Sequence, residues 1–390
     1  MNPLAKHMTD RNRRLAEYIE NRPGQLMEAR EKGLKIIASF PGNYVPEEII
    51  FAAGAIPICL IHAGSAENIN AAQVQVPEVM CSFSRAQIGE LSLKTNPFYS
   101  MIDMLIAPIT CQHLKKTAEI WEYRTNIDLF KLGVPSDSDI DFSLEYFIER
   151  LNTLKQRVEA VTGNKITDQK LHEAIGLYNR MRYLLRKISM MRRGTPLSIS
   201  SSEFIFLNHA SYYADPEFMV DFLEKTYEDL ENTSRAQDTD NPRILLIGPN
   251  MAYGDDTIYR LVEQAGVEIA IEELCEGIRY YWSDIKTDED PIQSLAQGYL
   301  RDRLPCAFMR RSVRKRFDFS MGLVNDFNIS GVIWYELLGC ETYDSESYFF
   351  EQKMREKGIP MLIIESDYGT YDLPRLRTRV EAFVEQIKGV

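Results

Sequence analysis

The sequence predicts an α/β protein with two lobes, each built on a parallel sheet, and a helical segment between or beside them. In the first and last parts of the chain, short apolar runs typical of buried strands alternate with amphipathic stretches typical of helices. Such alternation indicates parallel sheets with helices on both faces. The expected strands are 56–61, 101–109, 244–247, 267–271, 332–338 and 361–364, and the expected helices of the last part are 257–264, 291–303, 313–327 and 344–357.

The middle of the chain predicts two long helices. Apolar residues recur at helical spacing over 144–161, and Gly163 follows as a C-terminal cap. A second pattern of the same kind covers 167–188, and the polar stretch 232–242 is the softest boundary in the chain. We therefore expect an N-terminal α/β lobe with leading helices over 1–140, a helical segment over 141–238, and a C-terminal α/β lobe over 239–390.

Composition limits the classes of partner. The 390 residues are 45% hydrophobic and 26% charged, as in ordinary globular proteins, and no apolar run reaches the length of a membrane span. The N-terminal stretch is polar and basic without a following apolar segment, so we expect a cytoplasmic protein with no membrane partner. The net charge of −12 argues against nucleic acid as the main partner, because a phosphate backbone requires a basic surface.

Three of the six cysteines are candidates for metal ligands. Cys81, Cys111 and Cys340 each lie just before a predicted helix, and the last two follow predicted strands. Ligand sites of open α/β sheets form at the carboxyl ends of strands, where helix N-termini favour thiolates. No CxxC pair is present, so a metal site here gathers ligands from distant parts of the chain. Three thiolates on a four-iron cluster leave one iron open for an exogenous ligand.

Packing is the competing interpretation of the cysteines, because free cysteine is among the most buried residue types. We expect Cys59 to belong to the core. Cys275 and Cys306 are alternatives for a fourth ligand, although packing is the better interpretation of both.

Five segments of the chain carry a recognisable pattern: 41–60, 77–90, 96–116, 290–306 and 339–369. The most specific is GCETYDSESYFFEQKMREKGIPMLIIESDYG, in which a Cys at a strand end precedes an acidic and aromatic helix start. Together these segments resemble the family of the benzoyl-CoA reductases and 2-hydroxyacyl-CoA dehydratases. A branch with homodimers and a double-cubane cluster also shares the last segment, whereas TCQHLKK at 110–116 departs from the form associated with that branch.

The resemblance implies two Rossmann-like lobes and a [4Fe–4S] cluster, or a double-cubane cluster, on Cys81, Cys111 and Cys340. It also implies a CoA thioester substrate, a homologous second subunit in a hetero- or homodimer, and a separate ATP-hydrolysing iron–sulfur activator. The activity would be dehydration of a 2-hydroxyacyl group or reduction of an aromatic ring. In agreement, the sequence has no GxxxxGK[ST] motif for ATP and no GxGxxG pattern in 247–256.

Further candidates lie near the cysteines and in a basic patch. His113 and Glu341 are the catalytic candidates, because each lies within two residues of a predicted ligand; the alternative is an ordinary helix surface. Arg310, Arg311 and Arg314 are the candidates for binding the phosphates of CoA, against a plain charged helix face.

The sequence thus predicts an iron–sulfur subunit of an ATPase-activated, low-potential system that acts on acyl-CoA thioesters. Three alternatives remain at this point. The first alternative is an electron-relay subunit, and the second is a homodimeric double-cubane reductase of small molecules. The third is a two-lobed small-molecule binding protein without redox chemistry.

Overall fold

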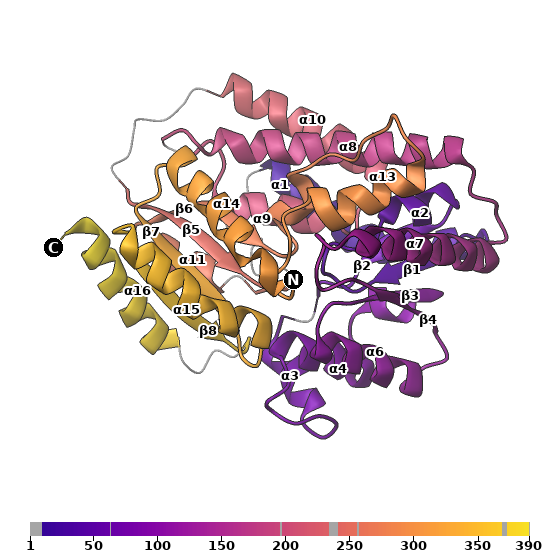
Figure 1. Ribbon diagram of the computed structural model, residues 1–390, viewed down its shortest axis with the longest axis horizontal. Helices are drawn as coiled ribbons and strands as arrows, with labels where there is room; N and C mark the ends of the chain where they lie inside the picture. The colour runs from indigo at the N-terminus through magenta and orange to yellow at the C-terminus, as the bar shows by residue number, and fades with distance from the viewer. Residues whose placement is uncertain are drawn as a thin grey trace.

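The computed structural model describes residues 10–62, 64–195, 197–233, 241–255, 257–368 and 373–389. It contains two four-stranded parallel sheets, with strand orders β2-β1-β3-β4 and β6-β5-β7-β8 (Figure 1). This confirms the predicted fold class of two Rossmann-like α/β lobes. The softest predicted boundary, 232–242, lies largely outside the described residues. The strands are β1 (Ile36–Ser39), β2 (Ile56–Cys59), β3 (Met104–Ile109), β4 (Asp128–Gly133), β5 (Arg243–Gly248), β6 (Glu268–Leu274), β7 (Gly331–Leu337) and β8 (Met361–Ser366).

The helices that come before β5 in the chain do not all cover the first sheet, since α9 also contacts β6 of the second sheet. The long helices expected in the middle of the chain are confirmed as α7 and α8. The elements are α1 (Asp10–Glu31), α2 (Glu47–Ala52), α3 (Ala66–Ala72), α4 (Ser82–Leu93), α5 (Pro97–Ser100), α6 (Gln112–Arg124), α7 (Asp141–Thr162), α8 (Asp168–Met191), α9 (Ser201–Ala210) and α10 (Pro216–Asn232).

The helices after β5 mostly match the predicted ranges. One difference is the expected helix 291–303, which forms a short α-helix followed by one π-helical turn, Gly298–Asp302. The elements are α11 (Thr257–Gln264), α12 (Ile278–Tyr281), α13 (Pro291–Gln297), a 3₁₀ turn (Arg310–Ser312), α14 (Val313–Asp326), α15 (Glu341–Glu356) and α16 (Leu373–Lys388).

Two strands were not predicted from the sequence. β1 is only four residues long, although all four are buried in the middle of the first sheet. β4 is an edge strand whose residues are mostly half-buried, so its apolar signal is weak. Both strands are recognised through their pairing with β3, which is a tertiary contact rather than a local pattern.

Helix α8 holds the two lobes together. It lies above both sheets in Figure 1, and two buried guanidinium groups bind carboxylates on different lobes. Arg182 donates to Glu48 of α2 at 2.8 Å and 2.9 Å. Arg192, which caps the C-terminus of α8, donates to both oxygens of Glu272 on β6 at 2.6 Å and 2.7 Å. These four side chains are at most 2% exposed. The pairs therefore fix the position of each lobe against one rigid element.

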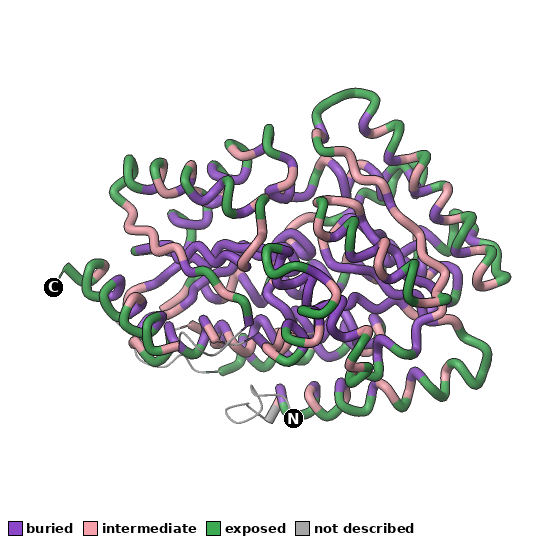
Figure 2. The backbone as a smooth tube through the Cα atoms, turned by 90° about the horizontal axis from the view of Figure 1, so that it is seen from below, coloured by how far each residue is buried: buried purple, intermediate pink, exposed green. Residues whose placement is uncertain are grey.

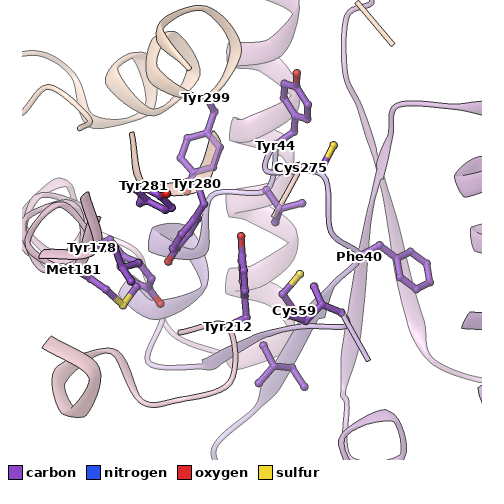
Figure 3. Close-up of a cluster of buried hydrophobic side chains, with 14 of the residues drawn as sticks. Phe40, Tyr44, Cys59, Tyr178, Met181, Tyr212, Cys275, Tyr280, Tyr281 and Tyr299 are labelled. Atoms are coloured by element: carbon purple, nitrogen blue, oxygen red, sulfur yellow. The ribbon is translucent and has the colours of Figure 1, made fainter. Parts of the chain in front are cut away.

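Buried backbone runs through the centre of the molecule, and exposed residues follow the outer helices (Figure 2). Where α8 meets the segment that contains α12, aromatic side chains form part of this core. In Figure 3, Tyr178 and Met181 of α8 lie beside Tyr280 and Tyr281. The rings of Tyr212 and Tyr280 are 4.9 Å apart between their centroids. Residues from both lobes and the helical segment thus share one continuous core.

Two adjacent glutamates of α2 lie in this core with different partners. Glu48 accepts hydrogen bonds from Arg182 and from the hydroxyl of Tyr299. Glu47 accepts only from the hydroxyl of Tyr280, at 3.0 Å, in the part of the chain that the structure describes. Burial, together with the neighbouring Glu48, raises the pKa of Glu47 to about 7. The Glu47 carboxyl is therefore retained in the core at a cost in stability.

Breaking the lobe-connecting pair at Arg192 is expected to destabilise the protein strongly. Arg192→Ala leaves the Glu272 carboxylate buried and unpaired, which costs about 3–5 kcal/mol in the free energy of unfolding. Chemical denaturation measures this loss. The control is Arg180→Ala, which removes the exposed pair of α8 with Glu224 and should cost less than about 1 kcal/mol. Equal effects of the two variants would contradict the assigned role of the buried pair.

The stability contributed by Glu47 is expected to fall as pH rises. The folded state keeps the proton up to about pH 7, whereas the unfolded state releases it near the ordinary value of 4.5. Stability is therefore lost between these values, by about 3 kcal/mol. Glu47→Gln removes this loss, so its unfolding midpoint should exceed that of the wild type at pH 8 and match it near pH 4.5. The matched variant Glu48→Gln should be destabilising at pH 8, because it leaves Arg182 unpaired; a stabilised Glu48→Gln would refute the distinction.

Candidate functional site

The three candidate cysteines are the N-cap residues of three helices. Cys81 precedes α4, Cys111 precedes α6 and follows β3, and Cys340 precedes α15 and follows β7. The Sγ of Cys111 accepts a hydrogen bond from the Leu114 amide at 3.4 Å. In each sheet, the strand β3 or β7 lies next to the strand where the chain order reverses, β1 or β5. Ligands of open α/β sheets bind in the crevice at such positions.

Cys81 and Cys340 are in direct contact although they come from different lobes. Their thiols are close enough for each to shift the pKa of the other, and the amide of Ser82 donates to the carbonyl of Leu338 at 2.9 Å. Gly339 makes this approach possible: a Cβ there would lie 2.6 Å from the Val79 carbonyl oxygen and 3.0 Å from the Cys81 nitrogen. Gly339 also has φ +78°, which disfavours any other residue.

The thiols of the three cysteines interact electrostatically. The hydrogen bond with Cys340, and then burial, raises the pKa of Cys81, and the same bond lowers the pKa of Cys340. Burial raises the pKa of Cys111 to about 11, and the charge of Cys340 adds to the effect. The structure therefore brings together all three cysteines singled out in the sequence, in a buried setting where a metal would have to displace protons.

His113 lies between the two cysteine loops. Its Nδ1 accepts a hydrogen bond from the backbone amide of Cys81 at 3.1 Å, so the ring proton is on Nε2. Nε2 lies 3.7 Å from Oε1 of Glu341, the residue after Cys340. His113 is 18% exposed and Glu341 68% exposed in their side chains. The two predicted catalytic residues are thus neighbours, and His113 links the backbone at Cys81 to the first turn of α15.

A second cysteine pair lies beside the first site. The Sγ atoms of Cys275, which follows β6, and Cys306 are 3.6 Å apart and buried. The hydroxyl of Tyr343, three residues after Cys340, lies 3.2 Å from the Sγ of Cys275. The charge of Cys306 also acts on Cys111 and on Cys340. The sequence favoured packing as the interpretation of both residues. The position of Cys275 at a strand end was the one feature of the sequence that indicated a ligand role.

The pair differs from ordinary buried thiols in its charge environment. Nη1 of Arg279 donates to the Sγ of Cys275 at 2.9 Å. The hydrogen bond with Cys275 lowers the pKa of Cys306 to about 5, with help from the charge of Arg279. Cys59, by contrast, lies in the core beside the aromatic residues of Figure 3, and burial raises its pKa.

Only part of the predicted basic patch is exposed and so able to bind phosphate groups. Arg310, Arg311 and Arg314 are exposed, and Arg311 pairs with Asp137 at 3.0 Å. The neighbouring Arg316 is buried, where it pairs with Glu346 and donates to the Cys306 carbonyl at 2.9 Å. The patch thus borders the loop that carries Cys306.

Two absences hold for the described ranges. No three His, Cys, Asp or Glu side chains there are arranged to hold a single metal ion. Among the same residues, no helix is long and apolar enough to cross a membrane.

Two parallel-sheet lobes, with cysteines that follow a strand of each sheet, are typical of an α/β enzyme subunit. Residues 43–387 match the family model of the 2-hydroxyglutaryl-CoA dehydratase D-component, and the chain belongs to this family. It is 26% identical to the candidate dehydratase subunit YjiM of Escherichia coli (strain K12), over 93% of this chain and 94% of the relative.

Two further relatives carry names with defined reactions. The chain is 21% identical to the (R)-phenyllactyl-CoA dehydratase beta subunit of Clostridium sporogenes, over 95% of this chain and 97% of that protein. It is 23% identical to one of the subunits of the benzoyl-CoA reductase of Thauera aromatica, over 91% of both chains. The resemblance found in the sequence is therefore confirmed.

Replacing Gly339 is expected to disturb the contact between the cysteine loops. Gly339→Ala introduces a Cβ that overlaps the backbone of Val79 and Cys81, in addition to about 1–2 kcal/mol of strain from its positive φ. The control Gly358→Ala has a similar φ of +72° and nothing within 4 Å of the added Cβ. Thermal unfolding should show a clearly larger loss for Gly339→Ala. Equal losses would mean that the loops separate without cost.

Proposed function

We propose that this chain is the iron–sulfur subunit of a low-potential system that acts on acyl-CoA thioesters, with a [4Fe–4S] cluster on Cys81, Cys111 and Cys340. The observation that carries the proposal is the convergence of these three cysteines, from two lobes, at three helix N-termini. The names of the relatives, dehydratase and reductase subunits for CoA substrates, support the reaction class.

The residues fit such a cluster. A four-iron cube is wider than a single ion and is held by thiolates, so its ligands need not stand as close as those of one metal ion. The three helix N-termini present positive dipole ends, which stabilise thiolates and an anionic cluster. When bound, the cluster would supply single electrons at low potential and one iron open to an exogenous ligand.

The chain's own residues then hold and orient the site. His113 fixes the Cys81 loop through its Nδ1, and its Nε2 lies near Glu341, so Nε2 is the ring atom that can exchange a proton at the site. Arg310, Arg311 and Arg314 lie on the surface where they can meet CoA phosphates. The beta-subunit names among the relatives support a homologous partner subunit, and a separate ATP-hydrolysing activator would provide the electrons.

A second candidate is favoured by the pair Cys275 and Cys306. Cys306, which pairs with Cys275, acts through its charge on both Cys111 and Cys340, so more sulfur lies near the first site than one four-iron cluster requires. A double-cubane cluster would use these additional thiolates. The chain would then be a homodimeric reductase of small molecules.

Iron content tests both candidates. Anaerobically purified protein should contain about four irons per chain for one cluster and about eight for a double-cubane cluster. Cys81→Ser should lose iron, whereas the core variant Cys59→Ala should keep it. Loss of half the iron in Cys275→Ser or Cys306→Ser would support the double-cubane alternative. Colourless, iron-free wild-type protein would rule out both redox functions and favour a non-redox binding protein.

Addition of an acyl-CoA to the same protein tests the substrate class. A change in the visible spectrum of the isolated chain supports a catalytic subunit. A change that requires the partner subunit supports an electron-relay role instead. No change in either case would refute action on CoA thioesters.

A further inference from the structure

Arg279 is a buried guanidinium shared between a carboxylate and a sulfur. It lies on α12, four residues after Cys275, and is 2% exposed. Nη2 donates to Glu273 at 2.9 Å, and Nη1 donates to the Sγ of Cys275 at 2.9 Å. Among the described residues, Arg279 is the arginine whose guanidinium donates a hydrogen bond to a cysteine sulfur. The positive charge therefore acts directly on the second cysteine pair.

Arg279 is also connected to the first cysteine site. Its Nη1 donates to the hydroxyl of Tyr343 at 2.5 Å, and Tyr343 lies in the first turn of α15, which begins after Cys340. The Tyr343 hydroxyl in turn lies 3.2 Å from the Sγ of Cys275. One side chain thus links the loop of Cys275 with the helix that Cys340 caps.

The geometry differs from that of a purely structural ion pair. Arg192 uses both of its terminal nitrogens on the two oxygens of Glu272. Arg279 gives only one nitrogen to Glu273, whose other oxygen accepts from the hydroxyl of Ser320. The second nitrogen is directed at sulfur and at Tyr343. A bidentate pair would satisfy a structural role better, so the arrangement indicates a function for the contact with sulfur.

We propose that Arg279 sets the reduction potential of the iron–sulfur centre through its fixed charge. Where Cys275 is a ligand, as in the double-cubane candidate, the hydrogen bond from Arg279 to its sulfur adds to the effect. This inference rests on the proposed iron–sulfur function. Hydrogen bonds to ligand sulfurs and nearby charge are principal determinants of cluster potential. The reduced centre carries one more negative charge than the oxidised one, so a buried cation stabilises it and raises the potential. Burial limits screening by salt. The electron comes from the external low-potential donor, and no bond is made or broken.

Redox titration of anaerobic protein, followed by electron paramagnetic resonance, tests this role. Arg279→Gln should keep its iron and shift the midpoint potential to a more negative value, by at least a tenfold change in the equilibrium constant, which is about 59 mV for one electron. Arg279→Lys keeps the charge and should restore part of the shift. Arg192→Lys alters a buried pair with Glu272 in which no cysteine takes part, and should leave the potential unchanged.

A second variant, with an expected shift of the midpoint potential in the opposite direction, keeps the test valid if Arg279→Gln misfolds. Glu273→Gln removes the negative partner and should shift the midpoint to a more positive value. Unchanged midpoints in iron-containing Arg279→Gln and Glu273→Gln proteins would overturn the role of Arg279 while leaving the cluster assignment intact. If Arg279→Gln loses iron, the midpoint potential of Glu273→Gln decides the role of Arg279: a positive shift supports it, and an unchanged value overturns it. Iron-free wild-type protein would instead refute the proposed function itself, and this inference with it.

Discussion

The fold depends on the two buried ion pairs that connect α8 to the lobes. Arg182 binds the first lobe through Glu48, and Arg192 binds the second through Glu272. A buried ion pair contributes little net stability compared with apolar packing, but loss of one partner is costly. This asymmetry strongly disfavours any displacement of either lobe that would separate a guanidinium from its carboxylate. The pairs therefore specify an arrangement rather than simply adding stability.

The cysteine site requires that arrangement. Cys81 and Cys111 come from the first lobe, whereas Cys340 and the pair Cys275 and Cys306 come from the second half of the chain. Their contact occurs across the lobes, through Gly339 against the Cys81 backbone and through His113 between the two loops. A small rotation of one lobe would separate these sulfurs. The connection through α8 thus supports the geometry of the site.

The surroundings of the site combine buried charge with buried sulfur. Arg279 and Arg316 approach the cysteine loops from the second lobe, each with a carboxylate partner, Glu273 and Glu346. Such residues are expensive to bury, and a core of apolar residues would be more stable. Their presence beside Cys275 and Cys306 is consistent with a site that must hold an anionic group. The same compromise holds for Glu47, which remains in the core and, among the described residues, accepts a hydrogen bond from Tyr280 rather than forming an ion pair.

The sequence alone determined the α/β class and the position of the three cysteines at helix starts. Both follow from local patterns, because strand and helix periodicity and the residue before a helix are readable along the chain. The tertiary structure decided what local patterns do not contain. It revealed β1 and β4 through their pairing, buried Arg316, turned His113 toward the Cys81 amide, and placed Cys275 against Cys306 under Arg279. Contacts between residues distant in sequence depend on how the lobes pack, and no spacing along the chain encodes that packing.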